Sequence, residues 1–271
     1  MQFSVLISIY SETRADDLSR CLQSLLDQTL VSSQIVLVQD GPIKKDVQQC
    51  INSYRKSLPI HEFLCPKNRG LGPALRDGLL QCTCDIVARA DSDDWSTPVR
   101  FSTQTNFLKN NPSISVVGGW MKEYYQDSGT PTGVLRKTPT NSTAAARIAT
   151  RRNPLNHPTV MFRKSDVLNS GNYESCLLFE DYLLWAKMLQ LRYKITSIPQ
   201  VLVETEIDST YFSRRGGIKY LKNELNLLVR LREIGFLSIF ESGIFLLCRL
   251  PLRLLPISTR RLIYRIFLRE S

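Results

Sequence analysis

Short, almost wholly apolar runs alternate with longer segments of helical periodicity through the first third of the chain. The runs lie at residues 3–10, 35–38, 60–64 and 85–90, and their composition is typical of strands buried on both faces of a parallel sheet. Helices are expected between them, over residues 46–56, over residues 74–81, and around Leu18, Cys21, Leu22, Leu25 and Leu26. This alternation predicts a doubly wound α/β sheet.

Polar side chains follow three of these runs, at the points where the predicted strands end. Ser8, Tyr10 and Glu12 stand at the end of the first strand, Asp40 follows the second, and an acidic loop over residues 91–94 follows the fourth. In a doubly wound sheet, ligands bind beyond the carboxyl ends of the strands. We therefore expect the three segments to meet around one ligand.

The acidic loop places Asp91, Asp93 and Asp94 within four positions. Crowded carboxylates repel one another and raise each other's pKa, so a folded chain seldom gathers them without a counter-ion. Mg²⁺ or Mn²⁺ would serve, because one or two carboxylates hold such a cation together with substrate phosphates. The alternative is a solvated acidic turn that caps a helix beginning near Pro98, and the motif alone does not decide between the two.

Positive charge is concentrated at the C-terminal end. The 271 residues carry a net charge of +10, but residues 211–271 hold 12 of the 35 Lys and Arg against 4 of the 25 Asp and Glu. Residues 1–210 are therefore left with only +2. The basic residues of the tail are interleaved with Leu, Ile and Phe, which argues against a nucleic-acid partner.

The amino-acid composition also indicates in which cellular compartment the protein is expected. Seven cysteines without a framework spacing favour reduced thiols in a cytoplasmic protein, and the first ten residues lack the basic start of a signal peptide. No segment is a clean transmembrane span, because charges and a proline interrupt the best candidate, residues 236–255.

The tail has the pattern of amphipathic helices. One is expected over residues 219–232, with Leu221, Leu225, Leu228 and Leu231 packed on the body of the protein. Another would start near Ser258 and align three arginines on one face: Arg261, Arg265 and Arg269. Such a helix can rest on anionic lipid, or it can simply cover the core.

A series of short motifs runs in a fixed order along residues 3–215. It comprises Tyr10-Ser11, Leu25-Leu26-Asp27-Gln28-Thr29, Val38-Gln39-Asp40-Gly41, Asn68 with Gly70 and Arg76, Asp91-Ser92-Asp93-Asp94, Arg100-Phe101, Val117-Gly118-Gly119, and Glu180-Asp181-Tyr182. In order and spacing these resemble the family 2 glycosyltransferases. Asp40-Gly41-Pro42, Asn156-His157-Pro158 and Arg214-Arg215-Gly216-Gly217 resemble the amylovoran-type branch, which builds bacterial exopolysaccharide, capsule and O-antigen repeat units.

The resemblance implies the GT-A fold, a Rossmann-like, mixed and mostly parallel sheet flanked by helices. The glycosyltransferase domain would occupy residues 1–210, with a nucleotide-binding half over about 1–97 and an acceptor half over about 98–210. Residues 211–271 would form a basic, helical appendage at the membrane. Gln39 and Ser11 depart from the common family residues, Asp and Asn, but neither departure removes a carboxylate that the chemistry needs.

For the donor, the resemblance implies a UDP-sugar. Asp40 would accept a hydrogen bond from the uracil, Arg76 would face the donor, and Ser8, Tyr10 and Glu12 would line the nucleotide. Without the family resemblance, Asp40 would be interpreted as a turn residue, and Arg76 would be interpreted as a charged residue on a helix surface.

The acidic loop would complete the donor site. Asp91 and Ser92 would lie near the ribose, and Asp93, with Asp91, would ligate the Mn²⁺ or Mg²⁺ that bridges the diphosphate. Asp94 would support the loop or contact the sugar. Trp95 would stack on a sugar or pack in the core.

Asp181 is the expected general base, which would take the proton from the acceptor hydroxyl. Single displacement would invert the anomeric centre and form a β-linkage, with Glu180 as an orienting neighbour. On the acceptor side, His157 would touch the acceptor or serve as a structural histidine. Arg214 and Arg215 would bind a diphosphate. Alternatively, they would be an ordinary pair of charged residues at the start of a helix.

These expectations describe a metal-dependent, inverting hexosyltransferase. It would move Gal or Glc from a UDP-sugar to a polyprenyl-diphosphate-linked sugar during lipopolysaccharide or capsule assembly, at the cytoplasmic face of the inner membrane. One alternative is a nucleotidyltransferase of the same fold type, although residues 11–17 lack the glycines of a phosphate-cradling loop. The other is a non-enzymatic basic binding protein.

Overall fold

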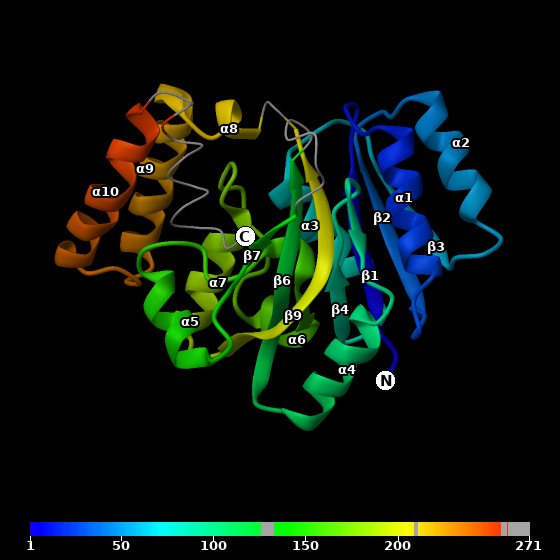
Figure 1. Cartoon of the computed structure of the whole chain (residues 1–271), viewed down its shortest axis with the longest axis horizontal. Helices are drawn as coiled ribbons and strands as arrows, with labels where there is room; N and C mark the ends of the chain where they lie inside the picture. The colour runs from blue at the N-terminus through cyan, green and yellow to red at the C-terminus, as the bar shows by residue number, and fades with distance from the viewer. Residues whose placement is uncertain (126–132, 209–210, 256–258, 260–271) are drawn as a thin grey trace.

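The computed structural model describes residues 1–125, 133–208, 211–255 and 259 (Figure 1). The expected helix with Arg261, Arg265 and Arg269 lies outside the described residues, and so does the side chain of Arg214.

Within the described residues, one nine-stranded sheet crosses the molecule in the order β3-β2-β1-β4-β8-β6-β9-β5, with β7 paired to β6 (Figure 1). The strands are β1 (Ser4–Ile9), β2 (Gln34–Asp40), β3 (Ile60–Cys65), β4 (Ile86–Arg89), β5 (Asp94–Ser96), β6 (Ile114–Tyr125), β7 (Val134–Arg136), β8 (Met161–Arg163) and β9 (Lys194–Ile207). β1 is parallel to both its neighbours, β2 and β4, whereas β8 is antiparallel to β4 and β6. The expected mixed sheet is confirmed.

Helices cover both faces of this sheet (Figure 1). They are α1 (Ala15–Leu26), α2 (Lys45–Tyr54), α3 (Leu71–Gln81), α4 (Arg100–Asn110), α5 (Ser142–Ala149), α6 (Lys164–Asn169), α7 (Glu180–Gln190), α8 (Tyr211–Arg214), α9 (Gly217–Glu233) and α10 (Ile239–Leu254), with a 3₁₀ turn, η2, at His157–Thr159. Side chains alternate between the faces of a strand. On β1, Val5 and Ile7 therefore pack with α1, α2 and α4, while Leu6 packs with α3 and α7.

One local prediction is corrected, and one short strand was not predicted. α3 begins at Leu71 and not at Ala74, because a proline in the first helical turn, here Pro73, loses no intrahelical hydrogen bond. The segment after the acidic loop is the short strand β5, which pairs with β9 about a hundred residues later. Apolar periodicity does not reveal a three-residue strand.

Helices α9 and α10 of the tail pack on the body. Tyr220, Leu227 and Leu231 of α9 join a core with side chains of α7 and with Phe245 of α10. Leu225 is exposed, so the prediction that it packs inward is wrong. The helix is rotated so that Glu224, only 2% exposed, faces the core in place of that leucine.

Glu224 can be buried because two guanidinium groups neutralise it. Arg249 Nη1 lies 2.5 Å from its Oε1, and Arg253 donates to both carboxylate oxygens at 2.9 and 2.8 Å. Both arginines also lie over aromatic rings, Arg249 over Phe245 and Arg253 over Tyr220. Breaking a buried ion pair costs about 3–5 kcal/mol, so this cluster ties α10 firmly to α9.

Candidate active site

The structure brings the three predicted strand ends together. β2, β1 and β4 are neighbours and run parallel, so their carboxyl ends lie at one edge of the sheet (Figure 1). Tyr10, Asp40 and Asp91 follow or end these strands. The three strand ends are therefore neighbours, as expected, and their sharing of one ligand stays a prediction.

A buried arginine anchors the acidic loop. Arg89, only 1% exposed at the end of β4, donates from Nη2 to the Asp91 carboxylate and from Nη1 to the Leu6 carbonyl. The Cys21 thiol donates to the Asp91 carbonyl at 3.2 Å. These contacts fix the start of the loop.

The other two aspartates of the loop differ sharply in their surroundings. Asp94 is buried on β5, where it hydrogen-bonds Thr205, and burial raises the pKa of its carboxyl group well above the usual value. Asp93 remains accessible at the tip of the loop. There the loss of solvating water around its carboxyl group and, second, the negative charge of Asp91 raise the pKa of that group to about 6. Asp94 thus has the contacts of a support for the loop, while Asp93 is open to a ligand.

The acidic loop fits a cation that the substrate helps to hold. Within the described part of the chain, no three His, Cys, Asp or Glu side chains form a metal-binding group. Asp91 and Asp93 offer two carboxylates whose mutual repulsion a cation would relieve. Mg²⁺ and Mn²⁺ sites of this kind are completed by phosphate oxygens and water, so the pair suits a nucleotide-bound metal.

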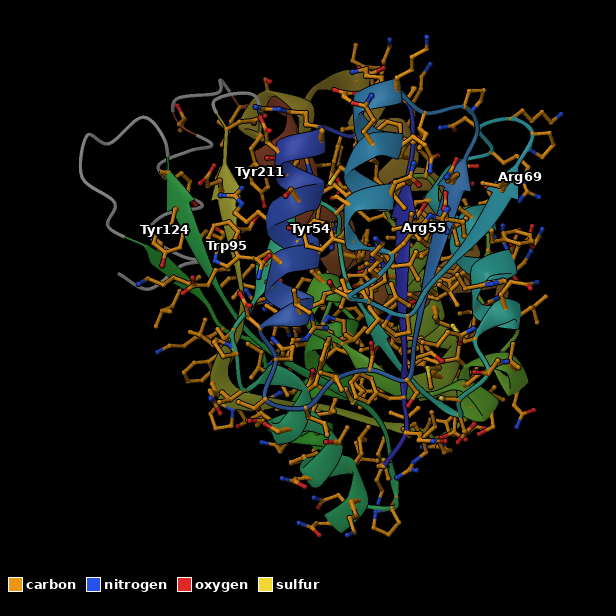
Figure 2. All side chains as sticks on the ribbon, turned by 90° about the vertical axis from the view of Figure 1, so that its right-hand side faces the viewer. Tyr54, Arg55, Arg69, Trp95, Tyr124 and Tyr211 are labelled. Atoms are coloured by element: carbon orange, nitrogen blue, oxygen red, sulfur yellow. The ribbon has the colours of Figure 1, made fainter. Side chains whose placement is uncertain are left out.

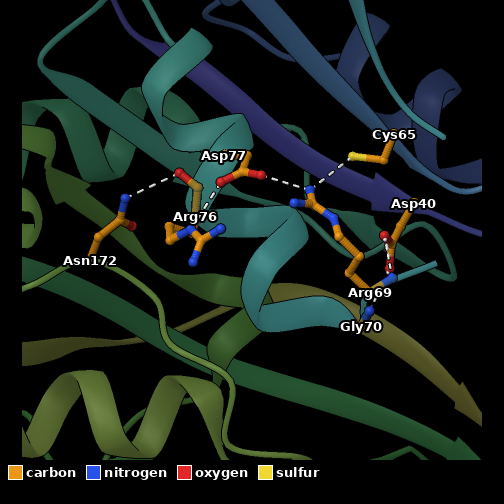
Figure 3. Close-up of polar contacts among 7 residues, drawn as sticks. All are labelled: Asp40, Cys65, Arg69, Gly70, Arg76, Asp77 and Asn172. Atoms are coloured by element: carbon orange, nitrogen blue, oxygen red, sulfur yellow. Dashed lines mark hydrogen bonds and ion pairs between the residues drawn. The ribbon is translucent and has the colours of Figure 1, made fainter. Parts of the chain in front are cut away.

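Asp40 is engaged with the backbone that precedes α3. Its two carboxylate oxygens accept from the backbone N–H of Arg69 at 2.9 Å and of Gly70 at 2.8 Å (Figure 3). Gly70 has a φ of +89°, which favours glycine. A carboxylate has about four lone-pair positions, so these bonds leave acceptor positions unused, but the residue is only 3% exposed, and its contact with a nucleotide stays a prediction.

Arg76 lies on the exposed side of α3. Its Nε donates to Asp77 Oδ1 at 2.9 Å, and Asp77 also accepts from Arg69 at 2.6 Å (Figure 3). The Arg76 carbonyl accepts from Asn172, which lies before α7. These contacts are those of a helix-surface charge, and a role in donor binding stays a prediction.

The remaining donor candidates line the same sheet edge. Ser8 and Ser92 are half-buried, whereas Tyr10 and Glu12 are exposed. The Tyr10 backbone N–H donates to the Thr13 hydroxyl at 3.0 Å, which shapes the turn into α1.

Asp181 occupies the first turn of α7. Its Oδ1 accepts from the Tyr182 backbone N–H at 2.8 Å, and its Oδ2 accepts from Asn153 Nδ2 at 2.5 Å. Burial raises the pKa of its carboxyl group, the two hydrogen bonds and the Arg136 charge oppose that effect, and the negative charge of Asp91 adds to it. That Asp181 shares a site with the acidic loop and acts as the base stays a prediction.

Glu180 faces α3 and not the open side of the site. It is 6% exposed and accepts from the Gly72 backbone N–H, and burial raises the pKa of its carboxyl group to about 7. A Cβ at Gly72 would lie 2.9 Å from Glu180 Cγ and 2.5 Å from the Glu174 carbonyl oxygen. Position 72, where α3 packs against α7, therefore requires glycine. Glu180 links the first turns of the two helices through its hydrogen bond with the Gly72 backbone N–H.

His157 has the contacts of a structural histidine. Its Nε2 lies 3.0 Å from the Tyr173 hydroxyl, and its ring meets Trp185 edge-on. Burial, with a smaller contribution from the Arg89 charge, lowers the pKa of His157 well below its usual value, which keeps the imidazole neutral. A contact with the acceptor stays a prediction.

Trp95 and Arg215 are both engaged with neighbouring aromatic or charged side chains. Figure 2 shows Trp95 beside Tyr124, and the two rings stack with centroids 5.9 Å apart. Arg20 covers the Trp95 ring at 4.1 Å, and Glu204 accepts from the indole N–H. Arg215 lies 4.0 Å over Tyr211.

Sequence reasoning missed two residues that organise the site. Arg89 is the buried anchor of Asp91, and its Nε has no hydrogen-bond partner within the described residues. A lone arginine in an apolar strand was the available signal. Asn153 holds Asp181 across 28 positions, and no local pattern marks it.

Comparisons with known proteins agree with this geometry. The family model described as Glycosyl transferase family 2 matches residues 4–170. A UDP-Gal:α-D-GlcNAc-diphosphoundecaprenol β-1,3-galactosyltransferase of Escherichia coli is 34% identical over 99% of this chain and 97% of its own length. The amylovoran biosynthesis glycosyltransferase AmsE of Erwinia amylovora is also 34% identical, over 97% of both chains.

Solved structures share the fold. Residues 1–349 of S. aureus TarS, in complex with UDP, match with a TM-score of 0.67 and 16% identity over 92% of this chain and 70% of that chain. The mannosyltransferase PcManGT from Pyrobaculum calidifontis, in complex with GDP-Man and Mn²⁺, matches with a TM-score of 0.59 and 14% identity over 95% of this chain and 77% of that chain. The predicted GT-A fold is thus confirmed. Given the extent of the family match and the identity to full-length relatives, the chain belongs to glycosyl transferase family 2.

Proposed function

We propose that this chain transfers a hexose, with galactose as the first candidate, from a UDP-sugar to a lipid-diphosphate-linked sugar in surface polysaccharide assembly. The observation that carries the proposal is the acidic loop at the shared carboxyl edge of β1 and β4, where buried Arg89 holds Asp91 and Asp93 stays open to a cation. The names of the E. coli and Erwinia relatives support the substrate class and the pathway type.

In this proposal Asp181 takes the proton from the acceptor hydroxyl, whose oxygen attacks the anomeric carbon as the bond to UDP breaks. Asn153 and the Tyr182 backbone N–H hold the carboxylate in one orientation and favour its ionised form. Asp93 and Asp91 would hold Mg²⁺ or Mn²⁺, which supplies positive charge to the leaving diphosphate. A single displacement inverts the centre, so an α-linked donor yields a β-glycoside.

A donor screen tests the proposal. The full chain, with MnCl₂ present, is incubated with UDP-Gal, UDP-Glc, UDP-GlcNAc or UDP-GalNAc and a lipid-diphosphate-linked GlcNAc or GalNAc acceptor. We expect transfer from UDP-Gal or UDP-Glc and a β-linkage in the NMR spectrum of the product. Turnover of none of these donors with either acceptor would refute the function, and an α-linked product would refute the single displacement.

We also propose that α10 rests on the cytoplasmic face of the inner membrane, where such an acceptor would be embedded. Ile239, Phe240 and Leu247 are each more than three-quarters exposed, whereas Arg249 and Arg253 turn inward to Glu224. A surface helix normally shows the reverse arrangement. No helix in the described part of the chain is long and apolar enough to cross a bilayer.

A liposome assay tests the membrane contact. Substituting Phe240→Ser and Leu247→Ser together should weaken binding to phosphatidylglycerol-containing vesicles roughly tenfold or more, because two apolar side chains no longer enter the interface. The matched control is Val31→Ser with Leu191→Ser, which removes two exposed apolar side chains elsewhere. Equal vesicle binding by the two double variants would rule out α10 as the contact.

A further inference from the structure

A basic cavity lies at the end of α5. It has a volume of about 410 Å³ and is lined by Arg147, Ile148, Arg151 and Arg152. Arg147 stands in the last turn of the helix, Arg151 follows one turn later, and all three arginines are exposed. Three guanidinium groups thus border one hollow.

Arg147 and Arg151 have no neutralising carboxylate nearby in the sequence. The sequence contains no Asp or Glu between Asp127 and Asp166. Within the part of the chain that the structure describes, the side chains of Arg147 and Arg151 make no ion pair and no hydrogen bond. Elsewhere in the protein, Arg89, Arg249 and Arg253 each have a carboxylate partner.

The cavity adjoins the candidate base. Arg151 and Arg152 are followed directly by Asn153, whose amide holds Asp181. On β7, Arg136 adds a positive charge that also acts on Asp181. One short segment of chain therefore supplies both the cavity lining and Asn153, the residue that holds the base.

The cavity also adjoins the apolar tail helix. Arg249 of α10 donates from Nε to the Arg151 carbonyl at 3.1 Å, which fixes the end of α5 against α10. The segment that lines the cavity thus contacts α10 through the Arg151 carbonyl and leads directly to Asn153, which contacts Asp181.

We propose that this cavity binds the diphosphate of the lipid-linked acceptor, an inference that rests on the proposed function. Guanidinium groups bind phosphate oxygens with paired, charge-assisted hydrogen bonds, and a diphosphate presents enough oxygens for two or three of them. Held there, the acceptor directs its sugar toward Asp181 and its lipid chain toward α10. The donor diphosphate binds separately, at the acidic loop.

The test uses the full chain with Arg147→Ala and Arg151→Ala combined, and two acceptors. One is a farnesyl-diphosphate-linked GlcNAc, and the other is an alkyl GlcNAc glycoside without phosphate. For the diphosphate acceptor we expect KM to rise at least about tenfold, since each lost charge-assisted bond weakens binding by about that factor. The kcat for this acceptor, the KM for the UDP-sugar and the rate with the neutral glycoside should stay unchanged.

Lys109→Ala is the matched control, because Lys109 is an exposed basic residue in the last turn of α4. Calorimetry with the farnesyl-diphosphate-linked GlcNAc alone adds a readout that needs no turnover. Wild-type transfer with an unchanged KM in the double variant would overturn the cavity proposal and leave the proposed function standing. Binding that depends on the arginines, in a protein that transfers no sugar, would support the cavity and refute the function. Equal losses with both acceptors would also overturn the cavity proposal.

Discussion

Substituting Asp181→Asn is expected to lower kcat by about 10³-fold, in the range typical for the loss of a general base, while the affinity for UDP stays the same. Asn keeps the size of the side chain, and Asn153 can turn its amide to preserve the hydrogen bond that now ends on Asp181. What disappears is the capacity to accept the acceptor's proton. Initial rates under saturating donor and acceptor, with UDP binding measured by calorimetry, check both expectations.

The pH profile separates this effect from a loss of structure. In the wild-type enzyme, the rate should fall as the pH drops through the pKa of Asp181, which burial raises above that of an ordinary aspartate. The variant should lose the part of this limb that Asp181 contributes, while the part due to protonation of Asp93 remains. Asp166→Asn, which removes a first-turn carboxylate from α6, is the matched control for helix charge. A variant at position 181 with near-normal kcat would remove Asp181 from the chemistry.

Substituting Asp93→Asn is expected to abolish most of the metal-dependent rate, with a loss of at least about 10²-fold in kcat/KM. Asp93 is the accessible carboxylate of the acidic loop, whereas Asp94 is buried against Thr205. Because a cation bridges protein and diphosphate only if both contribute ligands, the affinity for UDP should also stop responding to Mn²⁺. Calorimetric titration of UDP with and without MnCl₂ measures that response.

Asp85→Asn is the control for this substitution, because Asp85 stands just before the opposite end of β4, far along the strand from the acidic loop. Its carboxylate accepts from the Ser165 backbone N–H, a bond that Asn can keep. If the Asp93 variant bound UDP with an undiminished response to Mn²⁺, the acidic loop would not be the metal site.

The sheet edge was predictable because its signals are local. Residues 3–10, 35–38 and 85–90 are apolar enough to be strands buried on both faces, and parallel neighbours necessarily end at one edge. The chemistry of Asp91, Asp93 and Asp181 came from residue type and motif order. These signals depend on a few consecutive residues, and the roles assigned to the three aspartates stay predictions.

The missed features depend on pairs that are distant in sequence. Asp40 meets Arg69 and Gly70, some thirty positions away, and Asp181 meets Asn153. Glu224 is buried because Arg249 and Arg253 of α10 form ion pairs with its carboxylate. Helical periodicity of hydrophobic residues predicts that a leucine is buried and a glutamate exposed. It contains no information about a cationic side chain that is distant in sequence and pairs with the glutamate in the folded protein.

The inward-facing arginines of α10 change how alanine scanning of the tail should be interpreted. A scan designed on the assumption that these cations attract anionic lipid would find Arg249 and Arg253 indispensable and assign them to the bilayer. Their actual neighbours are Glu224 and aromatic rings, so the loss would come from a loosened helix pair. Neutral exposed positions such as Phe240 are the informative sites for that question.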